Sequence, residues 1–257
     1  MISVVVCSMD PARLEHISRE YARVMAGTPY ELIAIRDAKS MCEGYNRGFA
    51  QSRGEWVIFS HDDIEFLSPD VPARLLRLLG EEGLDVVGVA GTTRLSGGQW
   101  LSAGPGCTFG AVPHLMQDGQ IHLLMFGVPG RVVRNIMMMD GLFLACRREV
   151  AEKLSWDAAT FTAFHHYDLD WTLRAHAAGY RLGVVNDLTI LHMSEGNFGP
   201  EWKVSSQRFI AKHAALLTPI TYTYFAVSRA IFRTRAEAMK VIQDLCAACD
   251  GARGTPS

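Results

Sequence analysis

The chain has 257 residues, of which 49% are hydrophobic and 20% are charged, so it can bury a full core and is not an intrinsically disordered protein. Lysine and arginine number 25 against 27 aspartate and glutamate residues, and this near-neutral balance argues against a nucleic-acid partner. The first apolar run, Ile2 to Val6, is too short for a signal peptide and no run reaches membrane-spanning length, so we expect a cytoplasmic protein without a transmembrane segment.

Strands and helices alternate over the first sixty residues. Apolar, β-branched runs predict strands over Ile2–Cys7, Tyr30–Ile35 and Trp56–Phe59. Helices are predicted between them, one starting at Pro11 and one over Met41–Ser52. This alternation predicts parallel pairing through right-handed crossovers. The fold class is therefore α/β, with a Rossmann-like, mostly parallel central sheet flanked by helices.

The rest of the chain continues the alternation with one irregular insertion. Gly91–Gly110 is rich in glycine, serine and threonine and predicts a loop or hairpin, and His114–Met139 predicts strands with turns. The further predictions are helices over 71–79, 147–154, 167–178, 205–217 and 224–249, and strands over 85–90, 142–146, 181–185 and 188–191. We expect one domain over residues 1–217 and a helical C-terminal extension over 218–257, with a frayed tail from Gly251.

Six scattered cysteines predict small buried thiols of a reducing compartment. Cys246 and Cys249 have the spacing of a metal or redox pair, but no second pair accompanies them and the segment has a helical pattern. A structural role is the better interpretation.

Three ionisable residues, His61, Asp62 and Asp63, follow the buried strand that ends at Ser60. Open parallel sheets bind ligands beyond the carboxyl ends of their strands. Adjacent carboxylates repel each other unless a cation lies beside them, and hard dications prefer oxygen ligands that they share with phosphates. This stretch predicts a metal-diphosphate site. A polar turn in which Asp62 or Asp63 caps the next element remains an equal alternative.

Several motifs in order along the chain resemble those of the family 2 glycosyltransferases, which have the GT-A fold. The resemblance covers about four-fifths of the sequence, and it is closest to a bacterial branch of largely unassigned substrate. The motifs are Gly44-Tyr-Asn-Arg-Gly48, Gly54-Glu-Trp-Val-Ile-Phe-Ser-His-Asp-Asp63, Asp140-Gly-Leu-Phe-Leu before Arg147 and Arg148, Tyr167-Asp-Leu-Asp-Trp-Thr-Leu-Arg174 and His192-Met-Ser-Glu-Gly196.

The resemblance implies a metal-dependent, inverting transfer of a sugar from a nucleotide-sugar to an acceptor hydroxyl. Asp63 is implied as a ligand of Mn²⁺ or Mg²⁺, Asp62 as a contact of the nucleotide, and His192 as a third metal ligand or diphosphate contact. His61 stands where the family has an aspartate, and we expect it to be the weaker ligand for a hard cation.

Asp168 aligns with the family's catalytic base, which takes the proton of the acceptor hydroxyl. Tyr167 replaces the usual glutamate before it, which is a second departure from the family pattern. The alternative is that Asp168 only caps a helix. Asp170 lies two residues further and cannot share a helix face with Asp168, so we expect it to pair elsewhere, with Arg174 at helical spacing.

The nucleotide side is implied to include Ser8, Asp37 and Asn46, with turn or helix capping as the alternative for each. Asp37 can accept a hydrogen bond from the uracil N3–H, which favours a UDP-sugar. Asp140 and Gly141 are implied to border the acceptor, where glycine allows close approach of the backbone. The loop residues Trp100, Trp156 and Trp202 either stack on sugars or belong to the core. The acceptor and the oligomeric state are not predicted.

Two other functions are considered. The first is a non-catalytic module that binds a nucleotide or glycan, which the departures at His61 and Tyr167 leave open. The second is a sugar-phosphate nucleotidyltransferase, which needs a glycine-rich phosphate loop directly after the first strand. Because Cys7–Arg13 contains no glycine, the second function is the weaker one.

Overall fold

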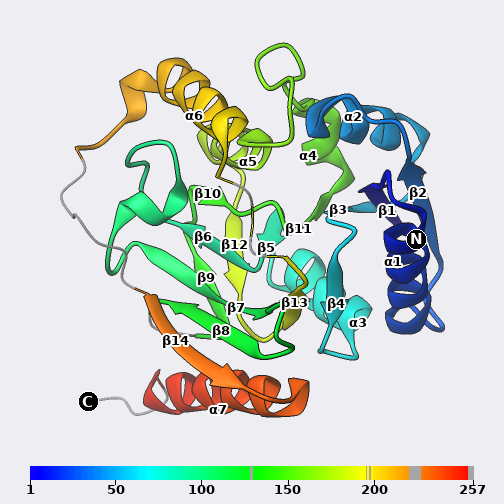
Figure 1. The fold of residues 1–257 in the computed structure, drawn as a ribbon, viewed down its shortest axis with the longest axis vertical. Coiled ribbons are helices and arrows are strands. Elements are labelled where there is room, and N and C mark those ends of the chain that lie inside the picture. Colours follow the sequence, from blue (N-terminus) through cyan, green and yellow to red (C-terminus); the bar gives the residue numbers. More distant parts are fainter. Residues whose placement is uncertain (128–129, 195, 197, 220–226, 254–257) are drawn as a thin grey trace.

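The computed structural model describes residues 1–127, 130–194, 196, 198–219 and 227–253, without the side chains of 250–253. Its core is two mixed sheets, around which the helices lie (Figure 1). The first sheet has the order β2-β1-β3-β11-β5-β12-β9. Its strands are β1 (Ile2–Cys7), β2 (Tyr30–Ile35), β3 (Trp56–Ser60), β5 (Val86–Gly88), β9 (Val132–Arg134), β11 (Phe143–Arg147) and β12 (Leu182–Val185).

In this first sheet, β1, β2, β3, β5 and β12 share one direction, while β11 and β9 run antiparallel to them. The α/β class and the predominantly parallel direction are confirmed, and the arrangement agrees with the GT-A fold that the resemblance implied. The side chains of Val4, Val5 and Val6 in β1 are all fully buried, as expected for a central strand covered on both faces.

The second sheet continues from the first and forms the other side of the molecule. Its main path is β10-β6-β7-β13-β4, and β8 pairs with both β7 and β14. The strands are β4 (Ile64–Phe66), β6 (Ala90–Thr92), β7 (Thr108–Leu115), β8 (Ile121–Phe126), β10 (Met138–Met139), β13 (Ile190–His192) and β14 (Val227–Phe232). The predicted loop over Gly91–Gly110 therefore begins and ends in strands of this sheet, joined by a short 3₁₀ turn, η2 (Trp100–Ala103).

The helices cover the sheets and lie close to the predicted positions. They are α1 (Pro11–Val24), α2 (Met41–Gln51), α3 (Val71–Leu75) continued by the π-helical η1 (Leu76–Glu81), α4 (Arg148–Lys153), α5 (Tyr167–Ala177), α6 (Pro200–Lys212) followed by the 3₁₀ turn η3 (Ala214–Leu216), and α7 (Arg235–Arg253). Helix α6 begins five residues before its predicted start, because Pro200 can occupy the first helical turn, where its missing N–H costs nothing.

The C-terminal extension is helical only in part. The helix predicted over 224–249 is confirmed from Arg235 onward, in α7, whereas Val227–Phe232 forms β14, which pairs antiparallel with β8 over its whole length. Residues 224–226 of the predicted helix lie outside the described residues. A strand is favoured over Val227–Phe232 because β8 would otherwise present an unpaired edge. Helix α7 then lies along β14 and β8, where Ile242 and Cys246 pack against Leu123 and Phe232 (Figure 1).

No disulfide joins the described cysteines, and Cys246 is buried in that contact, which agrees with a structural role. Within the described part of the chain, every helix is too short or too polar to cross a bilayer.

Candidate active site

Strand pairing brings His61, Asp63 and His192 together. His61 follows β3 and Asp63 precedes β4, and β4 pairs with β13 so that His192 lies opposite Ile64. The Met193 N–H also donates to the Asp63 carbonyl at 2.9 Å, which fixes this register. One ligand atom from each of the three side chains can be chosen so that all lie within 4.8 Å of one another. Two imidazoles and one carboxylate therefore converge at the carboxyl end of β3.

The Asp63 carboxylate is held in its charged form. Its Oδ1 lies 3.3 Å from His192 Nε2 and 3.7 Å from His61 Nδ1. Burial acts to raise the pKa of Asp63, but the hydrogen bond and charge of His192 lower it well below its ordinary value. The pKa of His61 is itself lowered, first by burial and then by the neighbouring His192, so its ring is neutral near pH 7. A neutral imidazole beside a carboxylate is the state in which both can ligate a metal.

Asp62 points away from this cluster toward the end of β1. Its Oδ2 accepts a hydrogen bond from the Ser8 hydroxyl at 2.8 Å. Arg13 Nη1 lies 3.6 Å from a carboxylate oxygen of both Asp62 and Asp63, and the Arg13 side chain is half exposed. Arg13 was not predicted as a site residue. Its position at the start of α1, one turn after the first strand, is the sequence feature that could have indicated it.

The two departures from the family pattern contact each other. His61 Nε2 and the Tyr167 hydroxyl are 2.7 Å apart, although the residues are 106 positions apart in the chain. Burial raises the pKa of Tyr167 well above its ordinary value, so the phenol keeps its proton. This bond orients the His61 ring with Nδ1 toward Asp63, as partners of metal-ligating histidines commonly do. His61, which we expected to be the weaker ligand, is thus an oriented member of the cluster.

Asp168 lies at the start of α5 and is held by the backbone of the segment before β11. Its Oδ2 accepts a hydrogen bond from the Gly141 N–H at 2.8 Å. A side chain at Gly141 would collide, because an added Cβ would lie 2.4 Å from the Tyr167 hydroxyl oxygen and 2.8 Å from Asp168 Cβ. Asp140, next to it, accepts from the Leu142 N–H at 3.0 Å and from Trp100 Nε1 at 3.3 Å. Asp140, Gly141 and Asp168 therefore form one polar group.

The carboxyl of Asp168 has a pKa near neutral pH. Its pKa is raised to about 7, mainly because the group is buried and secondly because of the neighbouring charge of Asp140. Hydrogen bonds from backbone N–H groups, including that of Gly141, oppose the rise without cancelling it. A base whose pKa is close to the working pH transfers protons most effectively.

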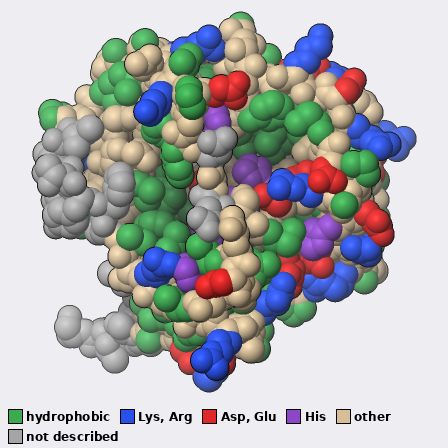
Figure 2. Space-filling model, in the orientation of Figure 1, with side chains coloured by type: hydrophobic (Ala, Val, Ile, Leu, Met, Phe, Trp, Pro, Cys, Tyr) green, Lys and Arg blue, Asp and Glu red, His purple; other side chains and the backbone are tan. Residues whose placement is uncertain are grey.

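A cavity of about 360 Å³ connects these groups. His61, His192, Asp140, Gly141, Tyr167 and Asp168 all line it, so the histidines of the cluster and the Asp168 group face one space. Figure 2 shows a hollow on this face of the molecule in which histidine and hydrophobic side chains gather. His114, which the sequence analysis missed, also lines the cavity, because β7 pairs with β13 and places the rings of His114 and His192 5.2 Å apart.

Residues 3–213 match the sequence pattern of a glycosyltransferase-like family. The chain belongs to this glycosyltransferase family and is a glycosyltransferase. A search of curated proteins found no match.

Two solved structures are similar to this glycosyltransferase at low identity. The mannosyltransferase PcManGT of Pyrobaculum calidifontis, determined with GDP-Man and Mn²⁺, is 12% identical with a TM-score of 0.47, over 99% of this chain and 76% of that one. A protein from STIV is 12% identical with a TM-score of 0.40, over 76% of this chain and 95% of that one.

The other residues predicted on the nucleotide side, and Trp156, have their contacts outside the histidine cluster. Asn46, in α2, uses both ends of its amide on the Trp156 backbone, at 2.8 and 2.9 Å. Asp37 is 75% exposed after β2 and pairs with Arg47 at 2.8 Å. Trp156 is a core residue stacked on Trp171, with ring centroids 4.7 Å apart.

Trp100 and Trp202 both line the cavity. Trp202 lies in α6, so the prediction that it belongs to a loop was wrong.

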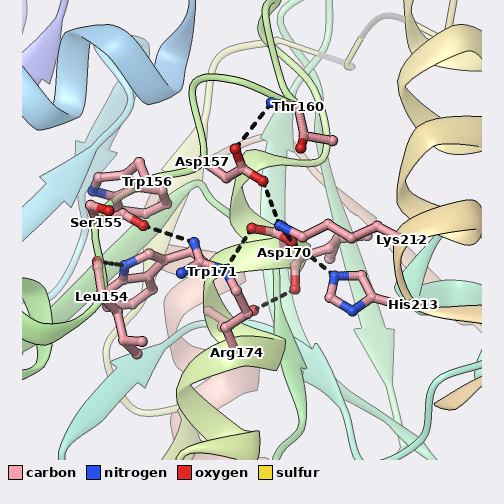
Figure 3. Close-up of polar contacts among 12 residues, drawn as sticks. Leu154, Ser155, Trp156, Asp157, Thr160, Asp170, Trp171, Arg174, Lys212 and His213 are labelled. Carbon is pink, nitrogen blue, oxygen red and sulfur yellow. Dashed lines mark hydrogen bonds and ion pairs between the residues drawn. The ribbon is translucent and has the colours of Figure 1, made fainter. Parts of the chain in front are cut away.

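Asp170 serves a separate network that joins α5 to the end of α6 (Figure 3). It is fully buried and accepts from Arg174 Nε at 2.8 Å, as its spacing predicted, and also from Lys212 Nζ at 2.6 Å and His213 Nε2 at 2.8 Å. Lys212 continues the network to Asp157 at 2.6 Å. The two carboxylates of α5 thus have different tasks: Asp168 faces the cavity, and Asp170 fixes the helix.

Asp170→Ala should lower the free energy of unfolding by about 3 kcal/mol, because it removes the acceptor that Arg174, Lys212 and His213 share in a buried network. Urea unfolding at pH 7 measures the change. Asp244→Ala is the matched control, since it breaks an exposed pair with Lys240 in α7 and should change the unfolding free energy by less than about 0.5 kcal/mol. Equal effects of the two variants would show that the network does not stabilise the fold.

Proposed function

We propose that the protein is a cation-dependent, inverting glycosyltransferase that moves a sugar from a UDP-sugar to an acceptor hydroxyl. The observation that carries the proposal is that the two histidines of a possible cation site and a buried carboxyl with a pKa near 7 line one cavity. The family assignment supplies the reaction class, and the geometry supports the task that we propose for each residue.

The residues present fit a divalent cation. His61, Asp63 and His192 each offer a ligand atom within a span that one ion can bridge, and Asp63 is buried in its charged form. When bound, such a cation neutralises the negative charge that develops on a departing nucleoside diphosphate. Imidazole ligands suit later transition metals better than Mg²⁺, whereas Mn²⁺ accepts nitrogen and oxygen ligands. We therefore favour Mn²⁺ over Mg²⁺.

Asp168 would act on the acceptor. In an inverting transfer, the acceptor oxygen forms a bond to the anomeric carbon as the bond from that carbon to the diphosphate breaks. The acceptor proton passes to the Asp168 carboxylate, and the nucleoside diphosphate leaves with the bonding electron pair. The Gly141 N–H holds one oxygen of Asp168 and so orients the other toward the cavity.

The remaining polar residues support a nucleotide on the other side of the cluster. Ser8 and Asp62 lie at the ends of β1 and β3, beside the half-exposed Arg13, which can balance diphosphate charge. Asp37 is exposed at the end of β2 and can accept from the uracil N3–H, which favours UDP over other nucleotides. Asn46 would act indirectly, because it fixes the Trp156 segment against α2.

The test is release of nucleotide from UDP-glucose, UDP-galactose, UDP-N-acetylglucosamine and GDP-mannose, each with Mn²⁺, Mg²⁺ or EDTA. We expect slow release from at least one UDP-sugar, fastest with Mn²⁺ and abolished by EDTA. Calorimetry with UDP and Mn²⁺ measures donor-side binding even where hydrolysis is slow. Binding of UDP that is equal with Mn²⁺ and with EDTA would contradict the proposal, as would release from GDP-mannose alone.

A further inference from the structure

Two chemically different groups of residues line the cavity. One group, which we call the polar end, consists of His61, His192, Asp140 and Asp168. The other consists of apolar side chains from η2, β7 and β8, which we call the apolar arm: Trp100, Leu101, Val112, Leu124 and Phe126. The proposed reaction uses the polar end and leaves the apolar arm without a task.

The apolar arm is a built surface of the second sheet. In the β7–β8 pair, Val112 lies directly opposite Leu124, so both side chains point to the same face. Trp100 packs edge-on against Phe126, with ring centroids 4.8 Å apart. The other edge of Trp100 donates through Nε1 to Asp140 Oδ2, so the arm is joined to the polar end through one side chain.

Away from the proposed cation site, the charge of the cavity disfavours an anionic occupant. Two carboxylates, Asp140 and Asp168, line it, and none of the described residues along its wall is a lysine or an arginine. Burial lowers the pKa of His165 and lowers that of His166 to about 4, so these lining imidazoles are neutral near pH 7. An acceptor phosphate here would lose its water without gaining a cationic partner. Arg13, the cation that contacts Asp62 and Asp63, is not among the described lining residues.

We propose that the acceptor is an uncharged hydroxyl compound with an apolar group, which lies in the apolar arm while the reacting hydroxyl faces Asp168. This inference rests on the proposed function, because it assigns the second substrate of the same reaction. Recognition combines two terms: burial of the apolar group against Trp100 and Phe126, and selection against anions by the carboxylates of Asp140 and Asp168. A long anionic carrier is therefore not the expected acceptor.

Three probes that share a glucose unit test the proposal by binding. They are phenyl β-D-glucopyranoside, methyl β-D-glucopyranoside and glucose 6-phosphate, titrated into the full-length protein with UDP and Mn²⁺ and followed by calorimetry. We expect the phenyl glycoside to bind at least about tenfold more tightly than the methyl glycoside, because a phenyl ring is removed from water. We expect glucose 6-phosphate to bind more weakly than either. Equal affinities of the two glycosides, or tightest binding of the phosphate, would overturn the proposal.

Two variants locate the effect in the apolar arm. Trp100→Ala should reduce the preference for the phenyl over the methyl glycoside to less than about threefold. Leu101→Arg should improve binding of glucose 6-phosphate and weaken that of the phenyl glycoside, and it keeps the test decisive if Trp100→Ala does not fold. Val204→Arg is the matched control, since Val204 is 49% exposed on α6 and does not line the cavity. A preference that persists in Leu101→Arg as in Val204→Arg would place the apolar group elsewhere.

Nucleotide release separates this inference from the proposed function. The control Val204→Arg should release nucleotide from the donor at the wild-type rate in the absence of acceptor, because Val204 does not line the cavity and His61, Asp63 and His192 stay in place. If the wild-type protein shows the phenyl preference but releases no nucleotide, the proposed function fails and the recognition of an apolar group stands. If release occurs without the preference, only the acceptor class is wrong.

Discussion

Asp63→Asn should lose Mn²⁺ binding and reduce sugar transfer by at least about a thousandfold. Asp63 is the only carboxylate among the described cluster residues His61, Asp63 and His192, and its amide replacement keeps the shape but loses the charge. The loss of rate follows because the negative charge on a departing diphosphate would no longer be balanced at this position. Titration of the protein with Mn²⁺, followed by the EPR signal of the free ion, measures binding without any turnover.

Two further variants test how much the Mn²⁺ affinity depends on residues beside the cluster. Asp62→Asn is isosteric and adjacent but is bonded to Ser8, so it should keep Mn²⁺ affinity within a few-fold while weakening UDP binding. Tyr167→Phe removes the partner of His61 Nε2, and its Mn²⁺ affinity should fall by about 10- to 100-fold, as is usual for partners of metal ligands. If Asp62→Asn loses the ion and Asp63→Asn retains it, the assignment of the two carboxylates is reversed.

Asp168→Asn should slow transfer to the acceptor by about 10²- to 10⁴-fold, while nucleotide and Mn²⁺ binding stay intact. The amide keeps the hydrogen bond from the Gly141 N–H but cannot take a proton. In the wild-type protein, transfer should rise with pH through about 7, because burial and Asp140 raise the pKa of Asp168 to that value and only the carboxylate is active. Initial rates between pH 5.5 and 8.5, with donor saturating, measure this profile.

The same raised pKa affects the stability of the fold, and the sign can be worked out. The folded state holds the Asp168 proton more tightly than the unfolded chain, so this group's contribution favours folding at low pH and declines as pH rises from about 4 to about 7. Asp168→Asn should remove that decline and be more stable than the wild type at pH 8. Unchanged transfer in Asp168→Asn would mean that another group is the base. If the variant loses as much stability between pH 5 and pH 8 as the wild type does, Asp168 is not the group with the raised pKa.

Local sequence was sufficient for most elements that carry the site. The β-branched runs of β1, β2 and β3 and the helix of α5 were predicted within a residue or two, because each pattern is set by burial of nearby residues. Strand β14 was not predicted, because it forms only through its pairing with β8, about one hundred positions earlier. Its own residues are mostly exposed, so they carry little periodic signal.

The sequence by itself determined the chemistry available at the site: carboxylates after β3, a carboxylate at the start of α5, and a histidine at the end of β13. The residue types and their order along the chain can be read from sequence motifs, without knowing which residues are close in space. Only the tertiary structure decided which of them meet. The His61–Tyr167 bond, the pairing of β13 with β4, and the apolar arm between η2, β7 and β8 all join segments far apart in the chain. Such contacts depend on strand register and on loop closure, which are set by the packing of the whole core rather than by any local stretch.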